Sequence, residues 1–378
     1  MSRLKSSYYA VLFNQSMSIV ARFDSWISLS YTNIVNNVGS FEISLSGDDP
    51  RKDLFELDAV LRIYRSIPGL GVGWTRVFDG LFRSKNEVVN ADGSKVFVAS
   101  GLGLLDFLSR TIINYPAGTI KSYKNIAAET AIKEYVEENC GPTAITDVGY
   151  ERLRSGVLPS FSVEITSSHG DIWEGDRAFE NLLDIVNEIA GLNQIDFDVE
   201  FDSDSKSFEF KTFLYQLGSD RTVIGLNSST GLNVSGNVPV VFSVERGNVS
   251  SLEYKNDRTS EANVVAVLGS GTSSTRIVVV REEATVSDSP WNRREISRSQ
   301  TGFISEMEMA GDQILFDSRA VENIDFSPLQ QESCMYVKDF FLGDKVTVRY
   351  GSMTFNKRII QISDQVSPDG SIEITFSE

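Results

Sequence analysis

The segment IDFDVEFDSDSKSFEFKTF, residues 195–213, decides the fold class because apolar and polar residues alternate along two runs within it. A period of two residues places one set of side chains on each face of a β-strand. The runs 195–201 and 207–213 flank the turn-forming stretch 202–205, so they predict an antiparallel hairpin with one apolar and one charged face. We expect the charged face to be solvated.

Helical periodicity precedes this hairpin. Asn125 can cap a helix whose apolar residues recur every three or four positions up to Cys140-Gly141-Pro142. A second helix is predicted from its cap at Asp176 to its stop at Gly191. The two helices and the hairpin together predict a mixed α/β segment whose helical stripes face the core.

The first hundred residues have the short apolar runs and frequent turns of a β protein. Strands are predicted at 40–45, 59–64, 83–89 and 95–99. The last two are joined by an Asp-Gly pair, which is a strong hairpin signal. This block therefore reads as antiparallel β.

After residue 218 the chain returns to strands with Ser/Gly/Asn-rich connections, which we expect to be surface loops. The predicted elements are a buried strand pair at 263–268 and 275–280, a polar excursion at 291–303, and three antiparallel strands at 344–350, 357–362 and 371–376. No short repeat is visible, although two β-rich blocks leave room for two related domains.

The composition is that of an ordinary globular protein. The chain has 378 residues, 41% of them hydrophobic, and a formal net charge of −17, so several soluble domains are expected. The acidic excess argues against a high-affinity nucleic-acid binder, which needs a basic surface, but it allows transient passage of DNA past an acidic wall. Without a long apolar run or a signal peptide, we expect folding in a reducing cytoplasm and no membrane insertion.

Few residues are available for metal or nucleophilic chemistry. Cys140 and Cys334 are far apart in the sequence and are expected to be buried thiols, not part of a disulfide framework or a zinc site. His169 is the only histidine, which excludes metal sites built on two histidines. A nucleophilic arrangement of Cys140, His169 and Asp171 lacks a recognisable motif, so a surface-loop histidine is the favoured interpretation.

The stretch Ser100-Gly101-Leu102-Gly103-Leu104-Leu105-Asp106 follows a strand and opens a helix, as a dinucleotide-binding turn does. Asp106 stands where that motif needs Gly or Ala, the preceding strand belongs to a hairpin, and no βαβ unit follows. We interpret the stretch as a strand-to-helix corner and predict no cofactor.

Acidic residues alternate along 196–204 like the ligands of a calcium loop. Phe201, however, stands at the position where an EF-hand loop needs glycine. A solvated strand face is the favoured interpretation, and a loosely bound cation at the turn of Asp202 and Asp204 is the alternative. No pair among the 52 acidic residues stands out for glycoside hydrolysis, so we predict no catalytic, cofactor or metal residues.

Four stretches, taken in order, carry a family resemblance: Phe23–Tyr31 followed by Asn36–Leu45, then Ser100–Arg110, then Arg177–Ile185 with Asp196–Val199, then Phe341–Val348. They resemble the first hairpin, the strand-to-helix junction, the mid-chain helix and hairpin, and the Leu-Gly-Asp-x-Val strand start of the tail-hub family of siphovirus baseplates. Each motif is degenerate, and the order of all four makes the case.

This resemblance implies an α+β, mainly β fold with two tube-like antiparallel β-barrel domains, an intervening α/β domain and a small inserted domain. The expected boundaries are 1–110 for the first barrel, 111–213 for the α/β domain, 214–280 with 336–378 for the second barrel, and 281–335 for the insertion.

The resemblance also implies a structural protein of the virion tail, assembled in the host cytoplasm, and not an enzyme. Three copies would form a ring that joins the tail tube to the tail tip and lets DNA pass through its lumen. The implied partners are the other copies of the homotrimer, a distal tail or tail tube protein, a tail fibre or tip protein, a tape measure protein, and DNA in transit without specific binding.

The alternative function is a tail protein that binds or cleaves cell-envelope glycans. In that case scattered carboxylates would act together with Trp26, Trp74, Trp173 or Trp291 as sugar platforms.

Overall fold

The computed structural model describes residues 6–115, 120, 122–144, 158–329, 331–366 and 371–376. Its contacts divide the chain into two compact units. Unit 1 comprises Met1–Ser251 together with Phe326–Ser377, and unit 2 comprises Leu252–Asp325. Unit 2 is therefore an insertion into the sequence of unit 1.

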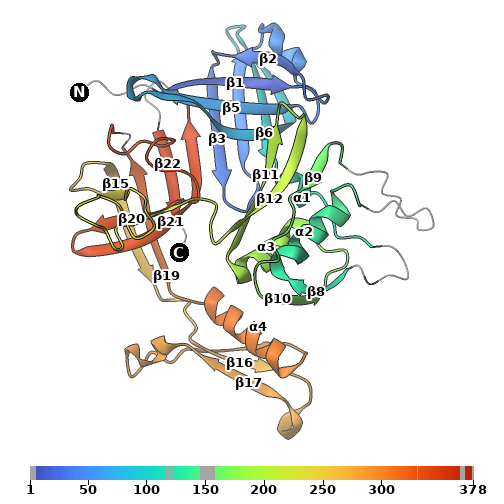
Figure 1. Ribbon diagram of the computed structural model, residues 1–378, viewed down its shortest axis with the longest axis vertical. Coiled ribbons are helices and arrows are strands. Elements are labelled where there is room, and N and C mark those ends of the chain that lie inside the picture. Colours follow the sequence, from blue (N-terminus) through green and yellow to red (C-terminus); the bar gives the residue numbers. More distant parts are fainter. Residues whose placement is uncertain are drawn as a thin grey trace. The chain divides into compact units, whose positions relative to one another are not determined.

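The first β block of unit 1 is an antiparallel sheet, drawn in blue to cyan in Figure 1. Its elements are β1 (Ser7–Phe13), β2 (Ile19–Phe23), β3 (Ser28–Ile34), β4 (Ser40–Ser46), η1 (Pro50–Leu54), β5 (Val60–Ile67), η2 (Pro68–Leu70), β6 (Val72–Val89) and β7 (Lys95–Gly103). The strand order is β3-β4-β7-β6-β5-β1-β2. The four strands predicted here are confirmed, and Gly93 turns the β6–β7 hairpin with a φ of +83°, a conformation that favours glycine.

The α/β segment follows the first block in unit 1. Its elements are α1 (Asp106–Ser109), β8 (Tyr123–Ala127), α2 (Ala128–Asn139), β9 (Phe161–Val163), β10 (Ile172–Asp176), α3 (Leu182–Asn193), β11 (Ile195–Asp202) and β12 (Ser207–Leu214). The predicted hairpin is confirmed, because β11 and β12 pair in antiparallel register from Ile195–Leu214 to Asp202–Ser207.

Both long helices of this segment begin later than predicted, because their predicted caps lie in paired strands. β8 pairs with β10, so Asn125 and Asp176 are strand residues and not caps. The N-cap of α3 is Asn181, whose side-chain oxygen accepts hydrogen bonds from two amides of the first turn. α3 also continues through Gly191, the predicted stop, and ends at Asn193.

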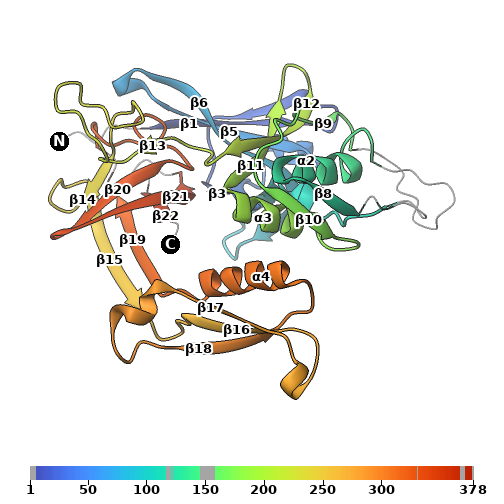
Figure 2. The ribbon, with the colours of Figure 1, turned by 60° about the horizontal axis from the view of Figure 1, so that its bottom comes forward.

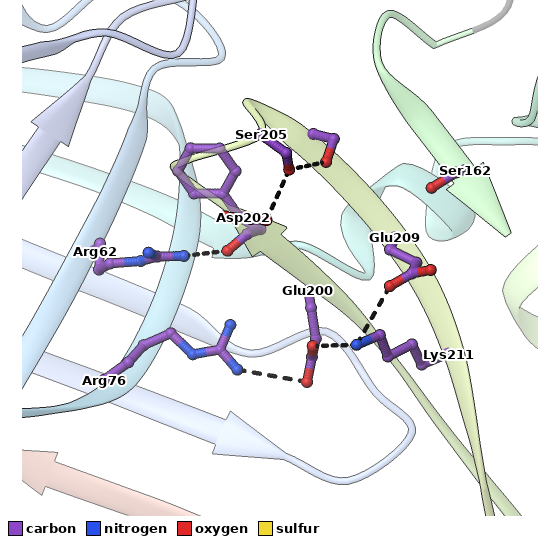
Figure 3. A pocket seen from close by; sticks show the side chains of 10 residues that line it. Arg62, Arg76, Ser162, Glu200, Asp202, Ser205, Glu209 and Lys211 are labelled. Atoms are coloured by element: carbon purple, nitrogen blue, oxygen red, sulfur yellow. Dashed lines mark hydrogen bonds and ion pairs between the residues drawn. The ribbon is translucent and has the colours of Figure 1, made fainter. Parts of the chain in front are cut away.

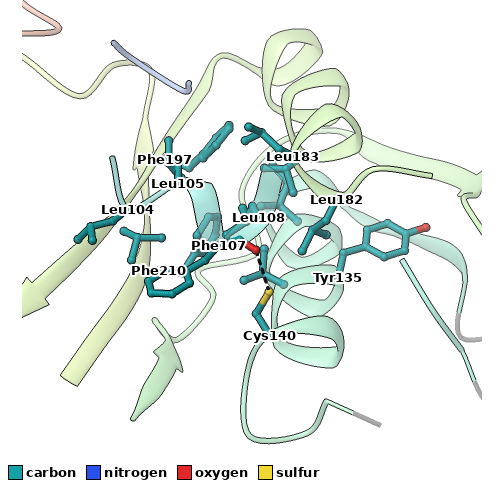
Figure 4. Packing of buried hydrophobic residues seen from close by; sticks show 14 of the residues in the cluster. Leu104, Leu105, Phe107, Leu108, Tyr135, Cys140, Leu182, Leu183, Phe197 and Phe210 are labelled. Atoms are coloured by element: carbon teal, nitrogen blue, oxygen red, sulfur yellow. Dashed lines mark hydrogen bonds between the residues drawn. The ribbon is translucent and has the colours of Figure 1, made fainter. Parts of the chain in front are cut away.

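An apolar core joins the α/β segment to the first β block. One cluster of buried side chains combines the stripes of α2 and α3 and the apolar face of β11 and β12 with residues of β1, β5 and β6. In Figure 4, Phe197 and Phe210 of the hairpin and Leu182 of α3 surround Phe107 of α1. The predicted core-facing role of both helical stripes is confirmed.

The second β block of unit 1 contains the strands near the C-terminal end of the sequence. Its strands are β13 (Asp220–Arg221), β14 (Val241–Ser243), β15 (Val249–Asp257), β19 (Val321–Pro328), β20 (Lys345–Tyr350), β21 (Met353–Gln365) and β22 (Ser371–Phe376). The strand order is β15-β19-β22-β21-β20, with β13 and β14 parallel to β20. The chain leaves unit 1 within β15, after Ser251, and re-enters it within β19, at Phe326. The predicted antiparallel ending over β20, β21 and β22 is confirmed.

The two β blocks repeat one arrangement of five strands. The order β3-β4-β7-β6-β5 corresponds to β15-β19-β22-β21-β20, both in the sheet and along the chain. In both blocks the long strand, β6 or β21, pairs first with the preceding strand and then with the following one. A bulge interrupts the second pairing at corresponding places, between Phe82 and Ser84 in β6 and between Ile359 and Gln361 in β21. The blocks are therefore structurally related.

Pairing of β3 with β21 joins the two blocks into one 14-stranded sheet. The recorded pairings in the described ranges do not close either half of this sheet into a barrel. The fold is mainly β, as predicted, whereas two closed barrels and the division into four domains remain predictions.

Unit 2 is a small α/β sandwich of its own. Its elements include β16 (Val264–Leu268), η3 (Ser273–Thr275), β17 (Val278–Glu282), η4 (Ala284–Asp288), β18 (Glu295–Ser299) and α4 (Ile304–Asp317). Figures 1 and 2 show α4 along the sheet β17-β16-β18, where Val265, Val267, Met307 and Leu315 form the core.

Two predictions for this region differ from the structure. The strand pair β16–β17 is confirmed, but it lies in unit 2 and not among the strands of the second block. The stretch 291–303, predicted to be a polar excursion, contains β18, which pairs with β16. Its side chains are mostly exposed because β18 is an edge strand, and this hides the period of two.

Candidate functional site

One open face of the sheet continues across both β blocks. It is formed by alternate residues of six neighbouring strands, and the strand registers place direct partners on the same face. We call it the hydroxyl face: Ser84, Asn86 and Val88 of β6; Val98, Ser100 and Leu102 of β7; Ser40, Glu42 and Ser44 of β4; Ser28, Ser30, Thr32 and Ile34 of β3; Gln361, Ser363 and Gln365 of β21; Glu373 and Thr375 of β22.

The hydroxyl face is polar but poor in charge. Glu42 and Glu373 are its only charged members among the side chains that the structure describes. Arg83 adjoins its edge at the β6 bulge, where it forms an ion pair of 2.6 Å with Asp58. A hollow of 520 Å³ lies on this face and is lined by β3, β4, β6 and β7 residues such as Ser30 and Ser100.

The two blocks meet at the β3–β21 seam, which is polar on both sides of the sheet. On the hydroxyl face, Thr32 Oγ1 and Ser363 Oγ are 3.0 Å apart. On the core side, Asp364 of β21 is fully buried and accepts hydrogen bonds from the hydroxyls of Tyr8 at 2.8 Å and Tyr31 at 3.1 Å. Arg65 Nη1 lies 3.6 Å from the same carboxylate.

Burial dominates the electrostatics of this seam. It raises the pKa of Asp364 above the ordinary range of a carboxyl, although Arg65 and the two tyrosine hydroxyls oppose the shift. It also raises the pKa of Tyr336, whose ring lies against the Arg65 guanidinium, to about 12. A buried ion pair within a ring of tyrosines therefore lies at the pairing of β3 with β21.

A second polar site lies where the β11–β12 hairpin faces β5 and β6. This cleft has a volume of 560 Å³. Figure 3 shows Glu200 between Arg76 and Lys211, at 3.7 Å and 2.8 Å respectively. Arg62, which also lines the cleft, forms an ion pair with Asp79 at 2.7 Å. Glu200 and Lys211 of the cleft are thus paired with each other, and both arginines have carboxylate partners.

The charged face of β11 is exposed only at its end, at Asp202, which corrects the prediction of a solvated face. Asp196 is buried and pairs with Arg358 of the second block and with Asn36 beside β3. Asp198 is half-buried, and burial raises its pKa to about 7. Alternation with period two cannot distinguish a solvated face from one that packs against charges of other segments. The acidic residues of this stretch gave no signal that separates the two cases, since they include both the buried Asp196 and the exposed Asp202.

The residues weighed for nucleophilic chemistry lie in ordinary structural positions. Cys140 is buried in the core, with its Sγ 3.8 Å from Thr111 Oγ1, and Cys334 is also buried, which raises its pKa to about 12. The prediction of buried thiols is confirmed. His169 lies in a loop, half-buried, with its ring edge-on to Tyr215, whereas Asp171 is exposed.

The glycines at the end of β7 serve close packing. A Cβ on Gly101 would lie 2.0 Å from the carbonyl oxygen of Leu81 and 2.4 Å from the ring of Phe41. Gly101 therefore lets β6 and β4 approach β7, and the stretch forms the predicted strand-to-helix corner.

The Asp202 turn is satisfied by its own chain. Asp202 accepts hydrogen bonds from the amide of Asp204 at 2.8 Å and from the hydroxyl of Ser205 at 2.7 Å, and these bonds lower its pKa. Within the described ranges, no three His, Cys, Asp or Glu side chains gather as metal ligands.

The tryptophans weighed as sugar platforms have different environments. Trp173 is buried against Tyr135 and cannot present a face to a sugar. Trp74 stands edge-on to Tyr9, and Trp291 of unit 2 is 88% exposed. No helix in the described part of the chain is long and apolar enough to cross a bilayer.

The fold is similar to that of solved phage tail proteins. The structural alignment with a tail protein from Neisseria meningitidis covers 98% of this chain and 97% of that one, with 12% identity and a TM-score of 0.59. It aligns over 98% of both chains with the 43 kDa tail protein of prophage MuSo2 from Shewanella oneidensis, with 11% identity and a TM-score of 0.58. The prophage tail protein gp18 from Listeria monocytogenes is similar with 10% identity and a TM-score of 0.52, over 98% of this chain and 94% of that one.

At these identities the likeness shows the fold alone. No curated protein matches the sequence. Residues 9–376 match the family described as Siphovirus ReqiPepy6 Gp37-like protein. Because the match spans nearly the whole sequence, the chain belongs to the Siphovirus ReqiPepy6 Gp37-like protein family.

Proposed function

We propose that this protein is a structural hub of a phage tail, in which three copies form a ring between the tail tube and the tail tip. The ring would leave a central channel for DNA, and the protein would have no catalytic role. Membership of a siphovirus family and the shared fold of tail proteins support this proposal.

The hydroxyl face is the observation that carries the proposal. It runs without interruption over six strands of both blocks, and its few charges are acidic. DNA is held by lysine and arginine side chains that neutralise its phosphates. A channel wall of hydroxyls, amides and occasional carboxylates would let DNA slide without being retained.

The partners proposed for such a ring lie above and below it in the tail. They are a distal tail or tail tube protein on one side, and a tail fibre or tip protein on the other, with a tape measure protein passing between. The virion tail is accordingly the proposed location.

Assembly is tested first by negative-stain imaging and mass measurement of the purified chain. We expect rings with an axial hole and a mass of about 126 kDa, three times 41.9 kDa. Monomers that release reducing sugar, or that are retained on cell-wall material, would contradict the hub and favour a glycan-acting tail protein.

The channel wall is tested by adding charge to it. The variant Ser30→Lys/Ser100→Lys places two lysines per copy on the hydroxyl face, and Ser297→Lys/Ser299→Lys places two on β18 of unit 2 as a control. In a low-salt binding assay with short duplex DNA, only the first variant should retain DNA. Equal retention by both variants, or tight binding by the unmodified ring, would contradict the proposed lining.

A further inference from the structure

The second half of β6 has an open edge. From Gly80 to Val89, β6 pairs with β7, but its pairing with β5 ends at Leu81. Among the described residues, no strand pairs with the other edge of residues 83–89. An open strand edge presents unpaired amides and carbonyls, which suits the addition of another strand.

The hairpin turn shows which amides point outward. The amide of Asn90 donates to the carbonyl of Ser94, so it faces β7. Backbone groups alternate in direction along a strand. The amides of Lys85, Glu87 and Val89 therefore point away from β7, toward the open edge.

The corresponding edge of the second block is occupied. There β21 takes the place of β6, and the edge that is open on β6 is paired with β3 over Gln361–Gln365. Two backbone bonds bracket this pairing, from Val35 N to Ile360 O at 2.9 Å and from Val366 N to Leu29 O at 2.8 Å. The vacant place on β6 thus has a filled counterpart within the same chain.

The counterpart of β3 in the second block is β15. It is the terminal strand of the sheet and pairs only with β19 within the described part of the chain. Each copy therefore offers one strand that corresponds to β3, namely β15, and one strand edge on β6 that corresponds to the edge of β21 occupied by β3. Copies related by rotation can satisfy both at once, because such a contact is heterologous and closes into a ring when the rotation between neighbouring copies is an exact fraction of a full turn.

We propose that β15 of a second copy of this chain adds to the open edge of β6. This inference rests on the proposed ring and names its subunit contact. The two bulges align β6 with β21, so that Ser84 corresponds to Gln361. When β15 takes the place on β6 that β3 has on β21, Asn256 lies opposite Ser84 and Leu252 lies opposite Val88. Val89 N would then donate to Ser251 O of the second copy, as Val366 N donates to Leu29 O within one copy.

This register continues the hydroxyl face into the next copy through Leu252, Tyr254 and Asn256. On the opposite side, Lys85 and Glu87 face Lys255 and Glu253, so like charges lie directly opposite and unlike charges lie diagonally. The charges therefore contribute little, and backbone pairing holds the contact.

The test distinguishes the contribution of the Lys85 backbone amide to self-association from that of the Lys85 side chain. Lys85→Pro removes only an outward amide, so the β6–β7 ladder stays intact, whereas Lys85→Ala keeps the amide as the matched control. In sedimentation experiments on the full chain, we expect the proline variant to self-associate at least tenfold more weakly and the alanine variant to stay within about twofold of the unmodified protein. Thermal unfolding of both variants checks that each is folded.

Cross-linking provides a second measurement that does not depend on a weakened variant. The native thiols are buried, so Asn86→Cys/Tyr254→Cys should yield disulfide-linked trimers on mild oxidation, and Asn86→Cys/Ser297→Cys should not.

The outcomes distinguish the contact from the ring. Trimers that persist in the proline variant and do not cross-link through residues 86 and 254 would overturn the proposed contact and leave the ring. An unmodified protein that stays monomeric at every concentration would overturn both.

Discussion

The first β block is joined to its two neighbours in unit 1 in contrasting ways. The α/β segment packs on it through an apolar cluster that includes Phe13, Leu81 and Phe201. The second β block is joined to it through backbone pairing over the buried Asp364 and Arg65. Burial of apolar side chains stabilises strongly and does not depend on a precise orientation. A buried ion pair contributes little net stability, but removal of one partner leaves an uncompensated buried charge and destabilises the fold. The first contact holds a segment in place, and the second fixes a register.

The apolar contact should give the largest loss of stability. Phe210→Ala removes a fully buried ring and should lower the free energy of unfolding by about 4 kcal/mol, measured by chemical denaturation. Leu192→Ala, at an exposed position of α3, is the control and should change it by less than about 0.5 kcal/mol. Equal effects of both changes would mean that this core is not formed as described.

The polar seam should respond next, and in a different manner. Arg65→Met leaves the Asp364 carboxylate buried without its cation and should cost about 3 kcal/mol. The double variant Arg65→Met/Asp364→Leu should recover more than half of that loss, because neither charge is then buried. A double variant whose loss equals the sum of the losses of Arg65→Met and Asp364→Leu, each measured alone, would show that the two side chains do not act together.

Asp198 should make the hairpin contact dependent on pH. Its pKa of about 7 in the folded chain is above that of an exposed carboxyl, so the folded state binds the proton more tightly than the unfolded state. The stability from this group is present in full below the unfolded pKa and is lost as the pH rises through 7. Asp198→Asn should therefore match the unmodified protein near pH 4 and be more stable by at least about 1 kcal/mol at pH 8. Unfolding curves of both proteins across this range measure the difference, and parallel pH profiles would contradict it.

The hydroxyl pair on the open side of the seam should matter least. Thr32→Val keeps the shape of the side chain and removes its bond to Ser363, for an expected loss of about 0.5 kcal/mol in the same denaturation assay. A loss of unfolding free energy as large as that of Arg65→Met would contradict this ranking and show that the Thr32–Ser363 pair stabilises the seam as much as the buried ion pair does.

Local pattern predicted the elements better than their boundaries. The hairpin at 195–213 was predicted to the residue at its start, because alternation and turn residues agree there. The start of α2 was wrong because Asn125 is a good cap by residue type, yet its backbone pairs with β10, which is distant in the sequence. Long-range strand pairing of this kind overrides local helix signals.

The candidate site was the least predictable part. Ser30, Ser100 and Ser363 carry no signal individually, and only the strand registers place them on one face. The relation of the two blocks is likewise hidden in the sequence, since it lies in strand order and in the position of a bulge. The interpretation of the stretch 100–106 as a strand-to-helix corner, by contrast, agrees with the structure and with the packing found at Gly101.

The place of unit 2 in the chain has a consequence for protein engineering. Its ends are continuous with β15 and β19, the counterparts of β3 and β4, which in the first block are joined by the short connection 35–39. A module grafted between two adjacent strands can be exchanged without changing the strands that receive it. Replacing residues 258–320 by a short turn should yield a minimal scaffold, and the same position should accept foreign domains for display on an assembled tail.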